Sequence, residues 1–324
     1  MSVVRLVAGL AAGAAFALLP PSCAVLGTTP SPERPIWERI DLPSLTACGG
    51  CHAEVYDEWA KSLHHGAWNN QNVQTATKEF AKLECRPCHS PQPVLPTGLD
   101  RAPAFRDFNH DDGVHCLSCH GLDRAKGGGV AATRTIENAP CKPRREPRLQ
   151  RAEMCFPCHE PTHQAFQDYY RSDAFATRVR CVDCHMQPTE HRRGRSHGPN
   201  GGFNADFVRR AVGWRCWLEN GVVHVELRNR CGHKFPGEIP SRSFLVQVTF
   251  TGAPAPTDPA HALLRRSHKG EDRPDNRLEP DEVRVLRFPL PGGATGATVE
   301  LLFKPLPLLP IESSFRIGSW SSTG

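Results

Sequence analysis

The pattern Cys-x-x-Cys-His occurs five times between residues 48 and 185. In each unit the two cysteines lie three positions apart, and a histidine directly follows the second one. Residues at i, i+3 and i+4 share one face of a helix, so two thiols and one imidazole would project together. The five units are CGGCH (Cys48–His52), CRPCH (Cys85–His89), CLSCH (Cys116–His120), CFPCH (Cys155–His159) and CVDCH (Cys181–His185).

Several kinds of cysteine site compete to explain this repeat. Ten of the 14 cysteines lie in the units, yet neither a disulfide framework nor a zinc ribbon requires a histidine after every second cysteine. Thioredoxin-like dithiols accompany a βαβ pattern, which is absent here. Covalent haem attachment uses all three residues, because the two thiols add to the haem vinyl groups and the imidazole binds the iron.

We therefore predict five covalently attached haem c groups. Their porphyrins would supply much of the buried apolar surface, so we expect that the apoprotein does not fold. The thioether anchors would be Cys48, Cys51, Cys85, Cys88, Cys116, Cys119, Cys155, Cys158, Cys181 and Cys184. The proximal iron ligands would be His52, His89, His120, His159 and His185.

The first 24 residues have the features of an export signal. Arg5 precedes an apolar run from Leu6 to Leu19, and small residues follow, so we expect cleavage after Ala24 and a linker over residues 25–35. A lipid anchor at Cys23 is the alternative. No later stretch reaches the roughly 18 apolar residues of a membrane span, so no transmembrane segment is predicted. These features indicate a periplasmic or extracellular protein.

The residue on the far side of each iron would decide the chemistry, because methionine raises a haem potential relative to histidine. Only Met154 and Met186 would survive signal removal, and each adjoins a unit, so neither can fold back onto its own haem. The sequence therefore favours low-potential haems with two histidine ligands, or a haem with an open site.

Eleven of the 16 histidines lie outside the units and are candidates for the distal position. Helical spacing of aromatic residues in VYDEWAKSLHHGAW predicts that the helix begun at His52 continues past it; of its two histidines we favour His64 over His65. His197 lies in a glycine-rich loop, where backbone can approach a flat ring. The other candidates are His233 in CGHKFPGE, His110 and His115 before the third unit, and, with less support, His163 and His191; His224 fits a strand, and His261 and His268 fit the surface.

The hydrophobic pattern changes after the last unit. From about Trp214 apolar residues alternate in VVHVELR, SFLVQVTF, EVRVLRF and TVELLF, which indicates antiparallel strands. We predict a mainly α haem domain over residues 36–210, with little regular structure between the units, followed by a small antiparallel β-sandwich over residues 211–324. A disulfide between Cys216 and Cys231 would join the first hairpin to the loop of His233. Cys141 has no evident partner.

Several segments give the chain a family resemblance. CGGCHAEVYDEWAKSLHHGAW resembles the opening of multihaem cytochromes related to the nitrifiers' tetrahaem cytochrome and to hydroxylamine oxidoreductase, with Tyr56, Trp59, Ser62 and His64 in the matching places. DGVHCLSCHG, SHGPNGGFNADFVRRAV and CGHKFPGEIPSRSFLVQV are similar to family segments too. The resemblance covers roughly residues 45–305. It implies closely stacked haem pairs in a mainly helical domain, with His64, His197 and His233 as distal ligands.

The chain departs from the enzymes of that group, because it has no CxxCK unit and has five units rather than eight. Its leading function is therefore electron transfer between redox partner proteins. A reductase or oxidase of a small nitrogen or sulfur oxyanion, acting at an open haem, is the alternative. A structural subunit of a redox complex, with the β domain as docking module, is a third hypothesis.

The formal charge of +5 does not point to nucleic acid, since the propionates of five haems would add on the order of ten negative charges. The arginine-rich runs at 191–195 and 142–148 would either pair with these propionates or form solvated surface.

Overall fold

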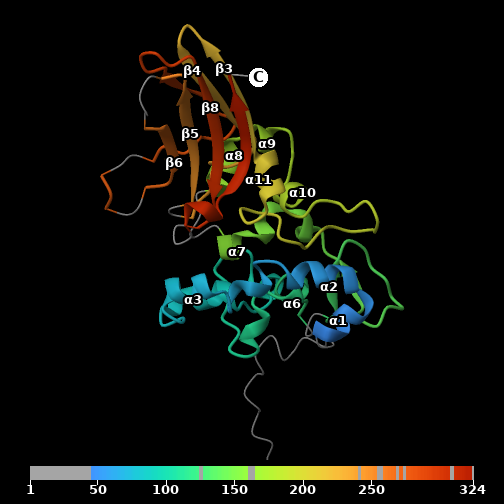
Figure 1. Cartoon of the computed structure of the whole chain (residues 1–324). Coiled ribbons are helices and arrows are strands. Elements are labelled where there is room, and N and C mark those ends of the chain that lie inside the picture. Colours follow the sequence, from blue (N-terminus) through green and yellow to red (C-terminus); the bar gives the residue numbers. More distant parts are fainter. Residues whose placement is uncertain are drawn as a thin grey trace, which may run out of the picture. The chain divides into compact units, whose positions relative to one another are not determined.

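The computed structural model describes residues 45–123, 127–159, 165–239, 242–253, 258–267, 270–272, 275–306 and 310–322. The predicted signal peptide, its linker and Cys23 lie outside these residues, as do His163 and His268. Short helices prevail up to Ala211 and longer strands follow, and Figure 1 shows this change along the chain. Both regions belong to one unit, Pro35–Gly324.

The helical region consists of short pieces. In the part of the chain that the structure describes, the longest helix has eight residues. The α-helices are α1 (Leu45–Cys51), α2 (Ala53–Ala60), α3 (Gln71–Thr77), α4 (Arg86–His89), α5 (Val94–Thr97), α6 (Cys116–His120), α7 (Phe156–His159), α8 (Ala165–Arg171), α9 (Asp173–Ala176), α10 (Cys181–His185) and α11 (Ala205–Ala211). The 3₁₀ turns are η2 (His65–Ala67), η3 (Leu83–Cys85), η4 (His110–Asp112), η6 (Pro147–Gln150), η7 (Ala152–Met154) and η9 (Ile311–Ser313).

Helices of this length are marginal on their own in water, so they depend on contacts outside themselves. Within the described ranges, none has the length and apolar character that crossing a bilayer demands. A two-stranded parallel pair, β1 (Val130–Ala132) and β2 (Pro143–Arg145), also lies in this region. The prediction of a helical region before the strands is therefore confirmed, whereas the units are joined by several short helices, 3₁₀ turns and one strand pair rather than by chain with little regular structure.

The helix predicted to run on from His52 is shorter than expected. His52 separates α1 from α2 with φ −119° and ψ 47°, outside the helical range. α2 then ends at Ala60. The backbone N–H of Val114 donates to the His64 carbonyl (2.8 Å), and Trp59 Nε1 donates to the Val114 carbonyl (2.9 Å). The backbone after Ala60 continues in tight turns, in which the Ser62 N–H donates to the Trp59 carbonyl (2.8 Å) and the Ala67 N–H to the His64 carbonyl (3.2 Å). His64 therefore lies in a turn rather than on a helical arm.

Seven strands form two antiparallel sheets after residue 211. One sheet has the order β3-β4-β7 and the other β6-β5-β8-β9. All four alternating segments are strands, as predicted, whereas β3, β6 and β9 were not among the predicted segments. The strands are β3 (Val212–Glu219), β4 (Val222–Asn229), β5 (Ser243–Thr251), β6 (Ala260–Arg265), β7 (Val283–Pro289), β8 (Gly296–Lys304) and β9 (Phe315–Ser321).

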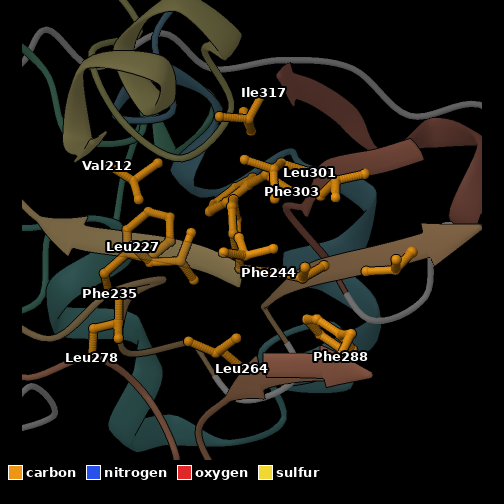
Figure 2. Packing of buried hydrophobic residues seen from close by; sticks show 14 of the residues in the cluster. Val212, Leu227, Phe235, Phe244, Leu264, Leu278, Phe288, Leu301, Phe303 and Ile317 are labelled. Carbon is orange, nitrogen blue, oxygen red and sulfur yellow. The ribbon is translucent and has the colours of Figure 1, made fainter. Parts of the chain in front are cut away.

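The buried faces of both sheets contribute to one hydrophobic cluster of 17 residues. Figure 2 shows Leu227 of β4, Phe244 of β5 and Phe303 of β8 gathered between the strands. Val208 joins the same cluster, so α11 packs on the strands. Phe235, in the loop that follows His233, packs edge-on against Phe244 with ring centroids 5.2 Å apart, which ties that loop to the core.

Candidate haem sites

Each CxxCH unit lies on a helical turn. α6 and α10 contain whole units, whereas α4 and α7 begin one residue after the first cysteine and α1 ends at the second. Such a turn places the two thiols and the following imidazole on one side, as attachment to a single haem would require.

In the described part of the chain no two cysteines form a disulfide. The predicted disulfide between Cys216 and Cys231 is therefore wrong, and the strand register explains why. Cys216 pairs with Val225, and the four residue-to-residue steps from Val225 to Asn229 alone span about 13 Å. A disulfide needs α-carbons within about 7 Å. Burial raises the pKa of Cys216 to about 11 and that of Cys231 to about 12, so both are inert thiols.

Thiols from different units lie next to one another. A hydrogen bond with Cys116 lowers the pKa of the Cys48 thiol to about 7, and a hydrogen bond with Cys158 lowers the pKa of Cys88. The first unit therefore lies beside the third, and the second beside the fourth. Burial raises the pKa of Cys155 to about 12, and the nearby Cys181 and Cys119 act in the same direction. The fourth unit thus also approaches the third and the fifth.

Three histidine pairs combine one proximal candidate with one distal candidate. The ring centroids are 6.4 Å apart for His64 and His159, 6.2 Å for His120 and His197, and 6.3 Å for His185 and His233. Two metal–nitrogen bonds of about 2 Å, plus about 1 Å from each nitrogen to its ring centre, give roughly 6 Å for two imidazoles on one iron. The spacing of all three pairs fits an iron between the rings.

The tautomers of these histidines suit metal binding. The Nδ1 atoms of His120, His185 and His197 lie 2.8 Å, 2.8 Å and 2.9 Å from the carbonyl oxygens of Ala131, Asn200 and Arg195, respectively. A carbonyl only accepts, so each Nδ1 carries the proton and each Nε2 keeps its lone pair. His89 Nδ1 contacts the Ala67 carbonyl in the same way (2.6 Å), and His233 Nδ1 contacts the Lys234 carbonyl (3.2 Å).

Burial keeps the paired imidazoles neutral. It lowers the pKa of His64, His120, His185 and His233, and it lowers the pKa of His197 to about 4. A neutral imidazole is the form that binds a metal.

The loop of His197 is held by a carboxylate that the sequence did not single out. Glu58 of α2 accepts hydrogen bonds from the His197 backbone N–H (2.8 Å) and from Arg192 (2.6 Å). Burial acts to raise the pKa of Glu58, but these hydrogen bonds outweigh it and lower the pKa. The helix that follows the first unit thereby positions the histidine that faces His120 of the third.

The loop of His233 is held by the helices near the fourth and fifth units. Asp168 of α8 is fully buried and accepts from Arg171 (2.7 Å) and from the backbone N–H of Lys234 (3.4 Å). Asp173 of α9 donates its backbone N–H to Asp281 (2.7 Å). These contacts join the strand region to the helical region at the point where His233 faces His185.

His115, another predicted ligand, acts as a helix cap. Its Nδ1 accepts the backbone N–H of Ser118 (3.1 Å), and its own N–H donates to the Ser118 hydroxyl (3.2 Å), so it begins α6. Burial lowers the pKa of His115 to about 3. Over the residues that the structure describes, no histidine pair of the above spacing includes His115, His52 or His89.

The remaining histidines have other neighbours. His65 packs edge-on against Trp59 (4.5 Å between centroids), and the exposed His191 lies 3.6 Å from Glu54. His110 lies 4.3 Å from the Trp68 ring, with its buried Nε2 lacking a partner among the described residues. His224 stacks on Trp217 (4.9 Å) within the strands, as expected, and His261 lies on β6.

The arginine-rich runs contain residues that bind protein carboxylates. Arg192 pairs with Glu58 (2.6 Å), Arg195 with Asp183 (2.7 Å) and Arg148 with Glu146 (2.6 Å). These guanidinium groups are therefore already engaged by the chain itself.

Comparisons with known proteins agree with this geometry. A family model described as "Cytochrome c554 and c-prime" matches residues 47–121. The fold is similar to that of a penta-heme cytochrome c552 from Thermochromatium tepidum, with a TM-score of 0.65 and 18% identity over 86% of this chain and 98% of that chain. No curated protein matches significantly. Together, the matched segment and the fold support a multihaem c-type cytochrome.

Proposed function

We propose that the chain is an exported pentahaem c-type cytochrome that transfers electrons through closely packed, mostly bis-histidine haems of low potential. The three histidine pairs carry this proposal, because their spacing of 6.2–6.4 Å fits one iron between each pair of rings. Each pair contains the histidine of a CxxCH unit and a histidine from a distant segment.

The residues have distinct tasks in this proposal. The ten unit cysteines anchor the haems, and His52, His89, His120, His159 and His185 bind the irons from the proximal side. His159, His120 and His185 have His64, His197 and His233 as their distal partners. Haem c would supply a one-electron iron couple, whose potential is low with two histidine ligands.

The adjacency of thiols from different units supports a relay. The sulfur atoms of Cys48 and Cys116 lie next to each other, as do those of Cys88 and Cys158, so the first and third anchors would adjoin, as would the second and fourth. The charge coupling of Cys155 to Cys119 and Cys181 brings the fourth anchor close to the third and fifth. All five attachment points would thereby form one connected group, in which the fourth lies next to the second, the third and the fifth.

The wider setting is part of the same proposal. The predicted signal of residues 1–24 would export the chain to the periplasm or beyond, with or without a lipid anchor at Cys23, and redox proteins would be its partners. We also propose that the chain is related to hydroxylamine oxidoreductase. The two sheets would form a β-sandwich, since their buried residues share one cluster.

A second function, reduction or oxidation of a small nitrogen or sulfur oxyanion, is favoured by one observation. Among the described residues no histidine faces His89 at the paired spacing, and the nearest aromatic neighbour of its ring is Phe80, at 5.4 Å between centroids. A haem bound by His89 would then have an open side for an oxyanion.

Mass spectrometry and electron paramagnetic resonance of the purified holoprotein test both functions. Five haem additions to the mature chain are expected, and any other number would contradict the pentahaem proposal. Low-spin signals that do not respond to cyanide or nitrite would support a carrier alone. A high-spin signal that such ligands convert to low spin would favour the oxyanion enzyme.

A further inference from the structure

Arg242 lies where the two loops that hold His185 and His233 meet. The Asn200 carbonyl accepts the Nδ1 proton of His185 (2.8 Å). Two residues later, a Cβ atom built on Gly202 would be 2.7 Å from Cζ of Arg242. Gly237 follows His233 by four residues, and a Cβ atom there would be 3.1 Å from Nη1 of Arg242. The guanidinium therefore touches both loops.

The charge of Arg242 has no carboxylate counterpart among the residues that the structure describes. Its Nε donates to the Pro305 carbonyl (3.3 Å), and its guanidinium lies 5.7 Å from the centre of the Phe203 ring. No carboxylate within the described ranges pairs with it. Burial lowers the pKa of Arg242 to about 10, which reflects the cost of holding an uncompensated cation away from water.

Neighbouring arginines differ in this respect. Arg277 is more deeply buried than Arg242, which is partly exposed, but Arg277 pairs with Glu238 (2.5 Å) and with Asp275 (2.6 Å). Arg266 lies 3.6 Å from the other Glu238 oxygen. These carboxylates are thus already bound, and Arg242 is left for an anion that the described residues do not supply. A planar guanidinium suits a carboxylate, which it can bind through two hydrogen bonds.

We propose that Arg242 binds a propionate of the haem attached to Cys181 and Cys184. This inference rests on the proposed function, since it requires that haem between His185 and His233. The strand region would then supply both the distal imidazole and the counter-charge of the fifth haem. It would be part of that haem's site rather than a separate docking module.

The test is a spectroelectrochemical titration of holoprotein variants, after mass spectrometry has shown five haems in the wild type. Arg242→Gln should lower the midpoint potential of one haem, because losing a cation beside a propionate favours the ferric iron. The affected haem should be the one whose potential rises in His233→Met. Arg316→Gln is the matched control: it removes one positive charge from β9, where Arg316 is exposed and pairs with Glu300, and should leave all five potentials unchanged.

Two further variants keep the proposal testable if Arg242→Gln folds poorly. Gly202→Ala should push the guanidinium aside without removing it, since the three atoms nearest to the added methyl group all belong to that guanidinium, and should lower the same potential by less. Arg242→Lys keeps the charge but loses the two-pronged geometry, and should also shift that haem alone. Unchanged potentials, or equal shifts of all five haems, in the variants that fold would overturn the assignment.

The same titration separates a propionate from a dissolved oxyanion. A wild-type potential that is insensitive to added inorganic phosphate supports the propionate, whereas a phosphate-dependent potential that Arg242→Gln abolishes contradicts it. A wild-type chain without five haems would instead defeat the proposed function itself.

Discussion

The helical and strand regions bury apolar surface in different ways. The strand region has a continuous cluster of 17 buried residues, and Phe244, Val246 and Leu301 within it are completely inaccessible. The main cluster of the helical region has four members, Val94, Leu95, Ala131 and Met154. The difference indicates that the strands are stabilised by their own side chains, whereas the short helices need the haems as their core.

The histidine pairs occupy the place that a side-chain core would otherwise fill. In the polypeptide alone the rings of His64 and His185 are exposed and that of His120 is half-buried, and their partners stand about 6 Å away. Facing rings at such a distance leave a gap that the side chains of the protein do not close by packing ring against ring. The covalent porphyrins would fill that gap and supply much of the apolar surface.

Production of the chain without haem attachment should have the largest effect. We expect residues 45–185 to lose their structure, because helices of eight residues or fewer cannot persist alone. The strands β4, β5 and β8 should retain slow amide exchange, since their core is independent of haem. Hydrogen exchange followed by mass spectrometry measures both regions at once. Native-like protection across residues 45–185 would show that the helical region does not need haem for its stability.

Truncating a side chain in the strand core should destabilise the protein strongly. Phe244→Ala removes a completely buried ring and should lower the free energy of unfolding by about 3–5 kcal/mol. Phe175→Ala is the control, because that ring is 48% exposed, and it should cost far less. Urea unfolding of the holoproteins, followed by circular dichroism, gives both values. Equal costs for the two variants would argue against a continuous strand core.

Replacing one distal histidine should affect a single haem. His233→Met should raise one midpoint potential of five, by on the order of 0.1 V, because methionine favours ferrous iron. His191→Met is the control, since its exposed ring faces Glu54 rather than a unit histidine, and should change none. A spectroelectrochemical titration resolves the shift. Five unaltered potentials in His233→Met would refute the link between the strand region and a haem.

A small, pH-dependent effect is expected at Asp275. Burial acts to raise the pKa of this carboxyl, but hydrogen bonds from Arg277 outweigh it and lower the pKa. A lowered folded pKa adds stability above the unfolded value of about 4, and this stability is lost as the pH falls through the folded value. Asp275→Asn should therefore cost roughly 1 kcal/mol at neutral pH. Urea unfolding at several pH values should show the cost shrinking below about pH 4; a constant cost would contradict this reasoning.

Much of the chain could be predicted from the sequence, because its signals are local. The CxxCH spacing predicts a helical turn, and alternation predicts β4, β5, β7 and β8. β6 (AHALLR) and β9 (FRIGSWS) were missed, since neither alternates strictly and β9 contains Gly318. The end of α2 at Ala60 was missed too, because the aromatic spacing of the segment does not show where the backbone changes from helical bonds to the tighter turns that follow.

The parts of the site that could not be predicted from the sequence depend on contacts between residues far apart in the chain. His64, His197 and His233 could be singled out as candidates, but which unit each one faces depends on how distant loops pack. The roles of Glu58 and Arg242 depend on the same packing, and ordinary charged residues carry no local signal of it. The disulfide prediction failed for the related reason that residues 216 and 231 are close in sequence but lie far apart along a hairpin.

Near-infrared magnetic circular dichroism of the oxidised holoprotein tests the central claim most directly, because it counts haems with two histidine ligands. The three pairs at 6.2–6.4 Å predict at least three such haems out of five. Replacing His64, His197 and His233 one at a time should remove one bis-histidine haem each. Fewer than three bis-histidine haems in the wild type, or no loss in these variants, would contradict the account.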